Sequence, residues 1–341
     1  MSPQKYRCTE ANRVQIKLSG KVGLCCLLPN AFHPIDKINE EKIKLNQMIS
    51  DGDFSICGKC PNIFKVEEDA SMDIHSIDIY TNTLCPGRCF YCAYTSPGSM
   101  PPDLVDPTIP SVAQQVNIDA DLVGMLDQYI KSPAGKSLRA ISLSGGDSAF
   151  SPDFERLVEL IQSYQLKAVY LSFGLLPQAK EDFVVRMVGN KTLDLSISID
   201  ATTAETWEKV KKRPAKHWDT VVNFIDRACG AGGGEGVYIK FIINKMNYRE
   251  AEAFLPYWFA RGVRNFSISG MHVCTPEGEV NFCSPEEYAQ ACAVIKQQFD
   301  TLAMGPNDRV ALSVFDGLEV YFPHTPMYRS YEDEQEALRV G

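Results

Sequence analysis

The chain has 341 residues, enough for one large α/β domain and a smaller appendage at roughly 100–200 residues per domain. A formal charge of −9 without a lysine- or arginine-rich block argues against a nucleic-acid partner. Because no stretch reaches the roughly 18 apolar residues of a membrane span, and the polar start lacks the apolar core of a secretory signal, we expect a cytoplasmic protein without a membrane partner.

The first 70 residues hold few periodic elements. Arg13–Leu18 and Val22–Leu28 predict a β-hairpin, with Ser19–Lys21 as its turn. Asn39–Ile49 predicts a short helix that ends before the turn residues Asp51–Asp53. We expect these pieces to form a small module of their own.

From residue 74 the pattern changes to alternating strands and helices. The predicted strands are Ile74–Thr81, Ala140–Ser144, Ala168–Phe173, Asp194–Ile199, Val237–Ile243 and Asn265–Ser269. The predicted helices are Asp119–Lys131, Pro152–Tyr164, Gln178–Val188, Trp218–Cys229, Tyr248–Arg261 and Pro285–Leu302. Repeated strand–helix units indicate an α/β fold with a parallel sheet. Their number falls short of a closed (β/α)8 barrel, so we expect a partial (β/α)6 barrel.

Two segments of the predicted barrel domain are irregular in composition. Ser96–Ser111 contains five prolines and cannot form regular structure. Gly230–Gly236 contains five glycines and is expected to be a flexible loop. The expected domains are therefore 1–70, a cysteine-rich module; 71–303, the partial barrel; and 304–341, a C-terminal extension.

The twelve cysteines are distributed unevenly, and eight of them precede residue 93. Cytosolic thiols stay reduced, so cysteines at short spacings indicate metal or cluster ligation rather than disulfides. Cys85, Cys89 and Cys92 follow the first predicted barrel strand with the spacing Cys-x3-Cys-x2-Cys. Thiolates are the ligands of iron–sulfur clusters, and three of them leave one iron of a four-iron cluster open. A zinc site, the alternative, usually takes four ligands in Cys-x2-Cys pairs.

This spacing, with Tyr91 just before the last cysteine, resembles the signature of the radical S-adenosylmethionine (SAM) superfamily. The resemblance implies that Cys85, Cys89 and Cys92 form the catalytic site by holding a [4Fe–4S] cluster whose open iron binds SAM. In that family the reduced cluster cleaves SAM to a 5′-deoxyadenosyl radical, which abstracts a substrate hydrogen. The resemblance also implies an electron donor such as flavodoxin or ferredoxin.

Further positions match the family's SAM contacts, to which the resemblance also assigns Tyr91. Gly145–Gly146–Asp147 resembles its Gly-Gly-Glu motif, where glycines let the backbone approach SAM, although Asp147 is shorter than the usual Glu. The alternative is an ordinary strand-to-helix turn.

The end of the fourth predicted strand supplies two more candidates for SAM binding. Ser198 and Asp200 share one face of that strand, and Asp200 could instead cap the following helix. Arg213 resembles an arginine near SAM in the SPASM/twitch branch of the superfamily. The alternative for Trp207–Arg213 is a solvated basic helix end.

The N-terminal cysteines form a second group. Cys8-x11-Gly20-x4-Cys25 resembles the opening of SPASM and twitch domains, which carry auxiliary [4Fe–4S] clusters, and the pair Cys57 and Cys60 brings the ligands to four. Cys26 makes the second ligand ambiguous. In the family this module follows the barrel, whereas here it precedes it. Structural zinc is the alternative to an auxiliary cluster.

Three functions remain open. The first is a radical SAM enzyme that modifies or cross-links a peptide oxidatively, in which an auxiliary cluster accepts the substrate electron. The second is a radical SAM oxidase or epimerase of a small molecule such as a sugar, aminocyclitol or nucleotide. The third is a non-enzymatic iron–sulfur redox protein.

Overall fold

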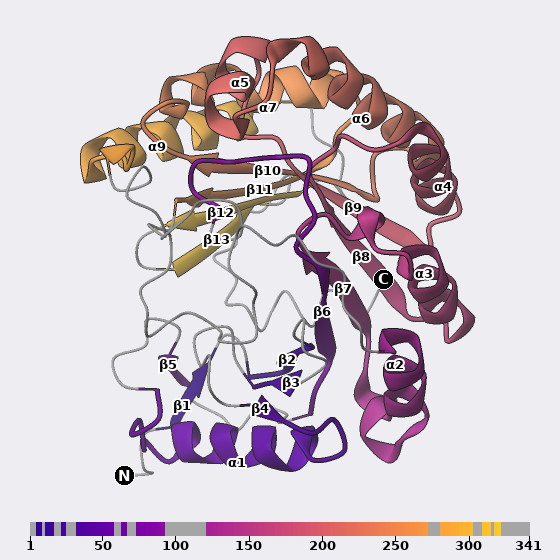
Figure 1. The fold of residues 1–341 in the computed structure, drawn as a ribbon. Helices are drawn as coiled ribbons and strands as arrows, with labels where there is room; N and C mark the ends of the chain where they lie inside the picture. The colour runs from indigo at the N-terminus through magenta and orange to yellow at the C-terminus, as the bar shows by residue number, and fades with distance from the viewer. Residues whose placement is uncertain are drawn as a thin grey trace. The chain divides into compact units, whose positions relative to one another are not determined.

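A computed structural model of the chain describes residues 5–8, 11–16, 22–24, 32–57, 63–66, 73–92, 121–271, 280–302, 309–314 and 317–321. The chain divides into two compact units. Unit 1 comprises Met1–Leu84 and Pro101–Val169, and unit 2 comprises Cys85–Met100 and Tyr170–Gly341. Figure 1 labels the helices and strands of both units.

Unit 1 is built on a sheet with the strand order β4-β3-β2-β6-β7. Its strands are β2 (Arg13–Ile16), β3 (Val22–Gly23), β4 (Phe32–His33), β6 (Ser76–Asn82) and β7 (Ala140–Gly145). The β2–β3 hairpin is antiparallel, and β2 then pairs in parallel with β6, as β6 does with β7. A separate antiparallel pair joins β1 (Lys5–Cys8) to β5 (Ile63–Val66).

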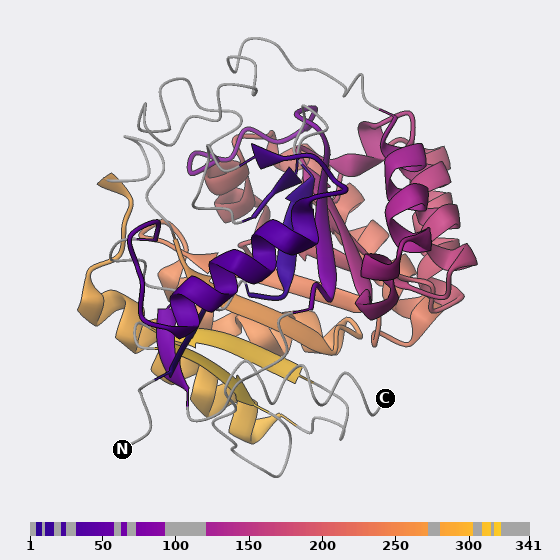
Figure 2. The same cartoon turned by 90° about the horizontal axis from the view of Figure 1, so that it is seen from below.

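The helices of unit 1 are α1 (Ile38–Ser50), α2 (Leu122–Lys131) and α3 (Phe154–Ser163), with short 3-10 turns η1 (Pro133–Ser137) and η2 (Ser148–Phe150). Helix α1, indigo in Figure 2, is fixed by polar side chains. The buried Lys42 ammonium donates to the Leu24 carbonyl at 2.6 Å, and Asn46 Nδ2 donates to the Ala11 carbonyl at 2.9 Å. These bonds hold α1 to the residues just before β2 and just after β3.

Unit 2 contains a sheet with the order β9-β10-β11-β12-β13. Its strands are β9 (Leu193–Ser198), β10 (Val237–Ile243), β11 (Asn265–Gly270), β12 (Arg309–Val314) and β13 (Gly317–Tyr321). All neighbours are parallel except β12 and β13. The chain passes from unit 1 to unit 2 within β8 (Lys167–Ser172).

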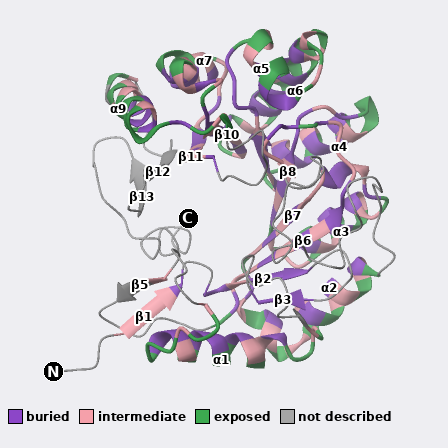
Figure 3. Ribbon diagram, turned by 60° about the vertical axis from the view of Figure 1, so that its left-hand side comes forward, coloured by how far each residue is buried: buried purple, intermediate pink, exposed green. Residues whose placement is uncertain are grey.

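The helices of unit 2 are α4 (Gln178–Gly189), α5 (Ala204–Lys211), α6 (Trp218–Gly232), α7 (Ala251–Ala260) and α9 (Pro285–Thr301), with the turns η3 (Ala215–His217) and η4 (Tyr248–Glu250). Figure 3 shows that exposed residues of α6, α7 and α9 lie on the sides turned away from the strands. Aromatic rings fill the space between helices and sheet, where Phe241 of β10 stacks on Phe254 of α7 at 4.1 Å.

The six predicted strands after residue 74 are confirmed as β6 to β11, and the fold is α/β with a mostly parallel sheet. The predicted N-terminal helix is also confirmed, as α1, and the hairpin is confirmed where it is described, as β2–β3. Its turn and residues 25–28 lie outside the described residues. The prediction of a loop over Gly230–Gly236 is wrong at its start, because α6 continues to Gly232 and ends at Gly233 in the left-handed conformation.

Some predictions cannot be compared with the structure. The segment Ser96–Ser111 lies outside the described residues, and the division at residues 70/71 and 303/304 stays a prediction. Among the helices of the described ranges, none combines the length and apolar character needed to cross a bilayer.

Candidate functional site

The loop that carries Cys85, Cys89 and Cys92 lies against the end of α5 in unit 2. The Arg88 N–H donates to the Lys211 carbonyl at 3.1 Å, and the Phe90 N–H donates to the Val210 carbonyl at 3.3 Å. The last carbonyls of an α-helix have no partner within the helix. The cysteine loop therefore caps α5, and α5 in turn fixes the backbone between the first and last cysteines.

Further contacts hold the first half of the loop. The Arg213 guanidinium, just beyond α5, donates through Nε to the Pro86 carbonyl. Gly87 faces the ring of Phe173, and a Cβ atom on Gly87 would lie only 2.3 Å from that ring. Only glycine fits there without a shift of the ring. The Gly87 N–H also donates to Cys85 Sγ at 3.3 Å.

The second half of the loop is held by its two aromatic residues. Phe90 is buried and packs with Val210 of α5 and Met271 after β11. The Tyr91 hydroxyl enters a polar cluster, where it donates to Asp200 and accepts from Lys211 Nζ at 2.8 Å. Ser198 Oγ is in the same cluster and lies 3.1 Å from Lys211 Nζ.

Asp200 and Lys211 form the centre of this cluster. Both side chains are fully buried, and Lys211 Nζ lies 2.5 Å from Asp200 Oδ2. The Ile242 N–H donates to Asp200 Oδ1 at 2.6 Å. Protein donors therefore reach both oxygens of this carboxylate.

The backbone at Asp200 is also fixed. Its φ of 55° is in the left-handed region, which non-glycine residues adopt at a cost. Asn247 Nδ2 donates to the Asp200 carbonyl at 2.9 Å. The helix-capping alternative for Asp200 is wrong, because Thr203 is the N-cap of α5 and accepts from the Thr206 N–H at 3.3 Å.

Burial and charge shape the ionisation of these groups. Burial raises the pKa of the Cys89 thiol to about 11, and the nearby Lys211 charge opposes this rise. Burial, the Asp200 carboxylate and Cys89 raise the pKa of Tyr91 well above its usual value. Burial lowers the pKa of Lys211, but the negative charges of Asp200 and Cys89 outweigh it and raise the pKa. Lys211 is therefore a buried cation beside the cysteine loop.

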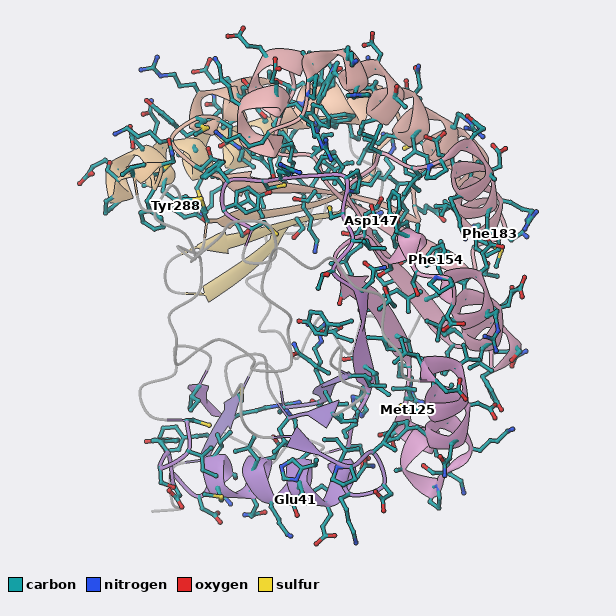
Figure 4. All side chains as sticks on the ribbon, viewed as in Figure 1. Glu41, Met125, Asp147, Phe154, Phe183 and Tyr288 are labelled. Carbon is teal, nitrogen blue, oxygen red and sulfur yellow. The ribbon has the colours of Figure 1, made fainter. Side chains whose placement is uncertain are left out.

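In unit 1 the turn Gly145–Gly146–Asp147 packs against the end of β6, and Figure 4 labels Asp147. The Gly146 N–H donates to the Asn82 carbonyl at 2.7 Å, and the Asp147 N–H donates to the Leu84 carbonyl at 2.6 Å. A Cβ atom on Gly146 would lie 2.2 Å from the Leu84 carbonyl oxygen. The close packing of the backbone therefore requires glycine at position 146, independently of any contact with SAM. The Asp147 side chain is buried and caps η2 through the Ala149 N–H at 3.3 Å.

The donor set of the loop fits an iron–sulfur cluster. Cys85, Cys89 and Cys92 are reduced thiols within eight residues of chain, on a backbone fixed from outside. Within the described ranges no three His, Cys, Asp or Glu side chains converge as for a single metal ion.

The N-terminal cysteines are described in part. Cys8 is buried at the end of β1, and Cys57 is half-buried after α1. Cys25, Cys26 and Cys60 lie outside the described residues. Their ligand set therefore stays a prediction.

Unit 2 brings together most of the predicted site residues: Cys85, Cys89, Tyr91, Cys92, Ser198, Asp200 and Arg213. Sequence reasoning missed Lys211, because it lies in a run of charged residues that suggested a solvated helix end. That alternative is wrong for Lys211, which is fully buried, whereas Lys209 and Lys212 are exposed. The available signal was the spacing of Trp207, Val210 and Lys211, which share one helix face.

The sequence places this loop in a known family. Residues 79–255, more than half of the chain, match the Radical SAM superfamily. The chain belongs to the radical SAM superfamily. Membership implies an enzyme of the radical SAM type that binds a [4Fe–4S] cluster and SAM. The matched residues include the cysteine loop, the Gly145–Gly146 turn and the whole polar cluster around Lys211.

The search of curated proteins found no match. Among solved structures, the chain is similar to Streptococcus suis SuiB bound to its precursor peptide SuiA, with a TM-score of 0.54, 10% identity and coverage of 81% of this chain and 63% of SuiB. SuiB bound to SAM gives a TM-score of 0.50 at 11% identity, covering 78% and 64%. anSMEcpe with bound SAM and a peptide gives 0.48 at 12% identity, covering 66% and 60%.

These similarities concern the fold alone. A further SuiB structure is covered over only 49% of its length, so the chain spans about half to under two thirds of the SuiB structures it matches.

Proposed function

We propose that the chain is a radical SAM enzyme whose catalytic [4Fe–4S] cluster is held by Cys85, Cys89 and Cys92. The observation that carries this proposal is the Cys-x3-Cys-x2-Cys loop, fixed on α5 within the residues that match the family. When bound, such a cluster supplies the electron that cleaves SAM reductively. The residues of the chain hold the cluster, orient SAM and exclude competing reactions.

We assign further roles from the positions of the side chains. Arg213 reaches the cysteine loop through the Pro86 carbonyl, which supports a role for it at the edge of the SAM site. Tyr91 and Ser198 share one polar cluster next to the cysteines, which supports a role for both near the cofactor. The turn Gly145–Gly146–Asp147 is proposed to offer backbone groups to SAM, as in the family motif.

The proposed substrate is a peptide. The support is the likeness in fold to SuiB, which has been solved with its precursor peptide SuiA. The proposed reaction is oxidative modification or cross-linking that begins with abstraction of a peptide hydrogen. We further propose that a flavodoxin or ferredoxin reduces the cluster and that the protein acts in the cytoplasm.

We also propose an auxiliary [4Fe–4S] cluster in a twitch-like module at residues 1–70, with Cys8, Cys25, Cys57 and Cys60 as ligands. The partial (β/α)6 barrel at 71–303 and the extension at 304–341 belong to the same proposal. The twitch-like module is supported by the β2–β3 hairpin followed by α1, the arrangement expected of such a module. In this chain the hairpin also extends the sheet of unit 1 through its pairing with β6.

The decisive experiment counts iron and measures SAM cleavage in the anaerobically reconstituted full chain. We expect about eight irons in the wild type and about four after Cys85, Cys89 and Cys92 are all changed to Ala, with no 5′-deoxyadenosine formed. Cys229→Ala, which removes a buried helical thiol, is the matched control. It should keep about eight irons and still form 5′-deoxyadenosine. Formation of 5′-deoxyadenosine by the triple variant would contradict the proposal.

The substrate is tested separately on the wild type. A peptide substrate predicts an oxidised peptide product whose formation requires SAM and the reductant. The auxiliary cluster predicts that changing both Cys57 and Cys60 to Ala leaves SAM cleavage partly intact and stops product formation. If that variant loses zinc rather than iron, the N-terminal module is a zinc site. Turnover of a sugar or nucleotide instead of a peptide would favour the small-molecule enzyme.

A further inference from the structure

Lys211 holds the cysteine loop in two ways. Its backbone carbonyl accepts from the Arg88 N–H at 3.1 Å, in the first half of the loop. Its ammonium donates at 2.8 Å to the hydroxyl of Tyr91, which lies between Cys89 and Cys92. One residue thus fixes both halves of the loop.

The ammonium is costly to bury. Lys211 and Asp200 are both fully buried, and their ion pair at 2.5 Å compensates the loss of hydration. Apolar residues of similar size often stabilise a core as well as such a pair does, so fold stability alone gives no reason for it. The cysteine loop lies directly beside the pair, through the contact of Lys211 with Tyr91.

Negative charge gathers on this side of the loop. The carbonyls of Val210 and Lys211 point at it, and the C-terminal end of a helix carries a partial charge of about −0.5. Ligation of a cluster adds three thiolates, because a coordinating thiol is deprotonated. Of the charged side chains that contact Tyr91 in the described part of the chain, Asp200 adds to this charge and Lys211 opposes it.

We propose that Lys211 is a positioning residue of the cofactor site, whose buried ammonium, anchored on Asp200, holds Tyr91 and offsets the negative charge of the bound cluster. This inference rests on the proposed function. Asp200 is then the anchor of Lys211 rather than a direct contact to SAM, since protein donors occupy both of its carboxylate oxygens.

The test measures the midpoint potential of the SAM-binding cluster in anaerobically reconstituted full chain by an EPR-monitored redox titration. The EPR signal that changes on addition of SAM identifies this cluster. Lys211→Met should shift the potential to a more negative value, because loss of a positive charge destabilises the reduced cluster. Tyr91→Phe keeps both charges and should leave the potential near that of the wild type. Lys209→Met, which removes an exposed lysine of α5, is the matched control.

A second variant separates charge from distortion of the loop. Asp200→Asn combined with Lys211→Met removes both charges and leaves no buried carboxylate unpaired. Its potential should lie between those of the wild type and Lys211→Met. SAM cleavage by Lys211→Met should fall about 10- to 100-fold, as for outer contacts of metal ligands.

Two results would overturn the role of the Lys211 charge. One is a wild-type potential in Lys211→Met. The other is a shift in the double variant as large as that of Lys211→Met, which would mean that a distorted loop causes it. If the wild type assembles no SAM-binding cluster on Cys85, Cys89 and Cys92, the proposed function itself fails.

Discussion

Lys211 and Asp200 form a fully buried ion pair, with 2.5 Å between Nζ and Oδ2, at the point where α5 meets the cysteine loop. Asp200 lies in the connection between β9 and α5, which also carries the α5 N-cap at Thr203, and Lys211 is the last residue of α5. The ion pair holds the C-terminal end of α5, which the cysteine loop caps. The stability of α5 and the shape of the loop are therefore coupled.

Removing one partner of this pair should destabilise the protein more than removing both. Lys211→Met leaves the Asp200 carboxylate buried without its cation, which is expected to cost about 3–5 kcal/mol. The double variant with Asp200→Asn should cost less. Lys209→Ala breaks an exposed pair with Glu205, which solvent screens, and should change stability far less than either buried substitution. Urea unfolding of the cluster-free protein measures the free energy of unfolding of all three variants. A double variant less stable than Lys211→Met would contradict the prediction.

The fit of Gly87 against Phe173 should control iron retention. In Gly87→Ala the new methyl group would meet the ring at 2.3 Å, so the loop or the ring must move. We expect fewer irons per chain after reconstitution. Because the ring is a side chain, Phe173→Leu should make room and restore part of the iron in the double variant. Equal iron content in Gly87→Ala and the wild type would show that the loop shape is not limiting.

Much of the fold was predictable because its signals are local. The hydrophobic runs that became β6 to β11 are bounded by helical patterns and by glycine or proline, so each element could be found by itself. The cysteine spacing needed no structure at all. Pairing between distant strands is different: β2 joins β6 across an interval of some sixty residues, and nothing near either strand specifies it.

The site was predicted less completely than the fold. Asp200 and Tyr91 were candidates because of their positions next to family motifs, but their contact was not predicted, since they lie 109 positions apart in the chain. Lys211 was overlooked because a lysine is rarely buried unless paired, and its partner is not adjacent in sequence. The Asp147 side chain caps η2, and the predicted approach of the Gly145–Gly146–Asp147 backbone to SAM stays a prediction. At Lys211 the charge of the side chain thus led to the wrong expectation that it is exposed.

Two glycine substitutions should have opposite effects on stability. A methyl group on Gly146 would lie 2.2 Å from the Leu84 carbonyl oxygen, a backbone atom that cannot move aside cheaply. We expect Gly146→Ala to cost about 3 kcal/mol or more. Gly230 is exposed within α6 and has no atom within 4 Å of an added methyl group, so Gly230→Ala should stabilise by about 0.5–1 kcal/mol. Thermal unfolding of the cluster-free protein compares them, and a neutral Gly146→Ala would contradict the packing argument.

The reactivity of the cysteines should distinguish the loop from the core. Cys85 and Cys92 are half-buried on the loop, whereas Cys229 is buried in α6 and desolvation raises its pKa to about 12. At pH 8 the Cys229 thiol therefore stays protonated, and the thiolate is the reactive form. Brief treatment of the cluster-free protein with iodoacetamide should therefore modify Cys85 and Cys92 and spare Cys229, as read by peptide mass spectrometry. After reconstitution the two loop cysteines should be protected as well, because their thiolates are bound to iron. If Cys85 and Cys92 are modified equally before and after reconstitution, they do not hold the cluster.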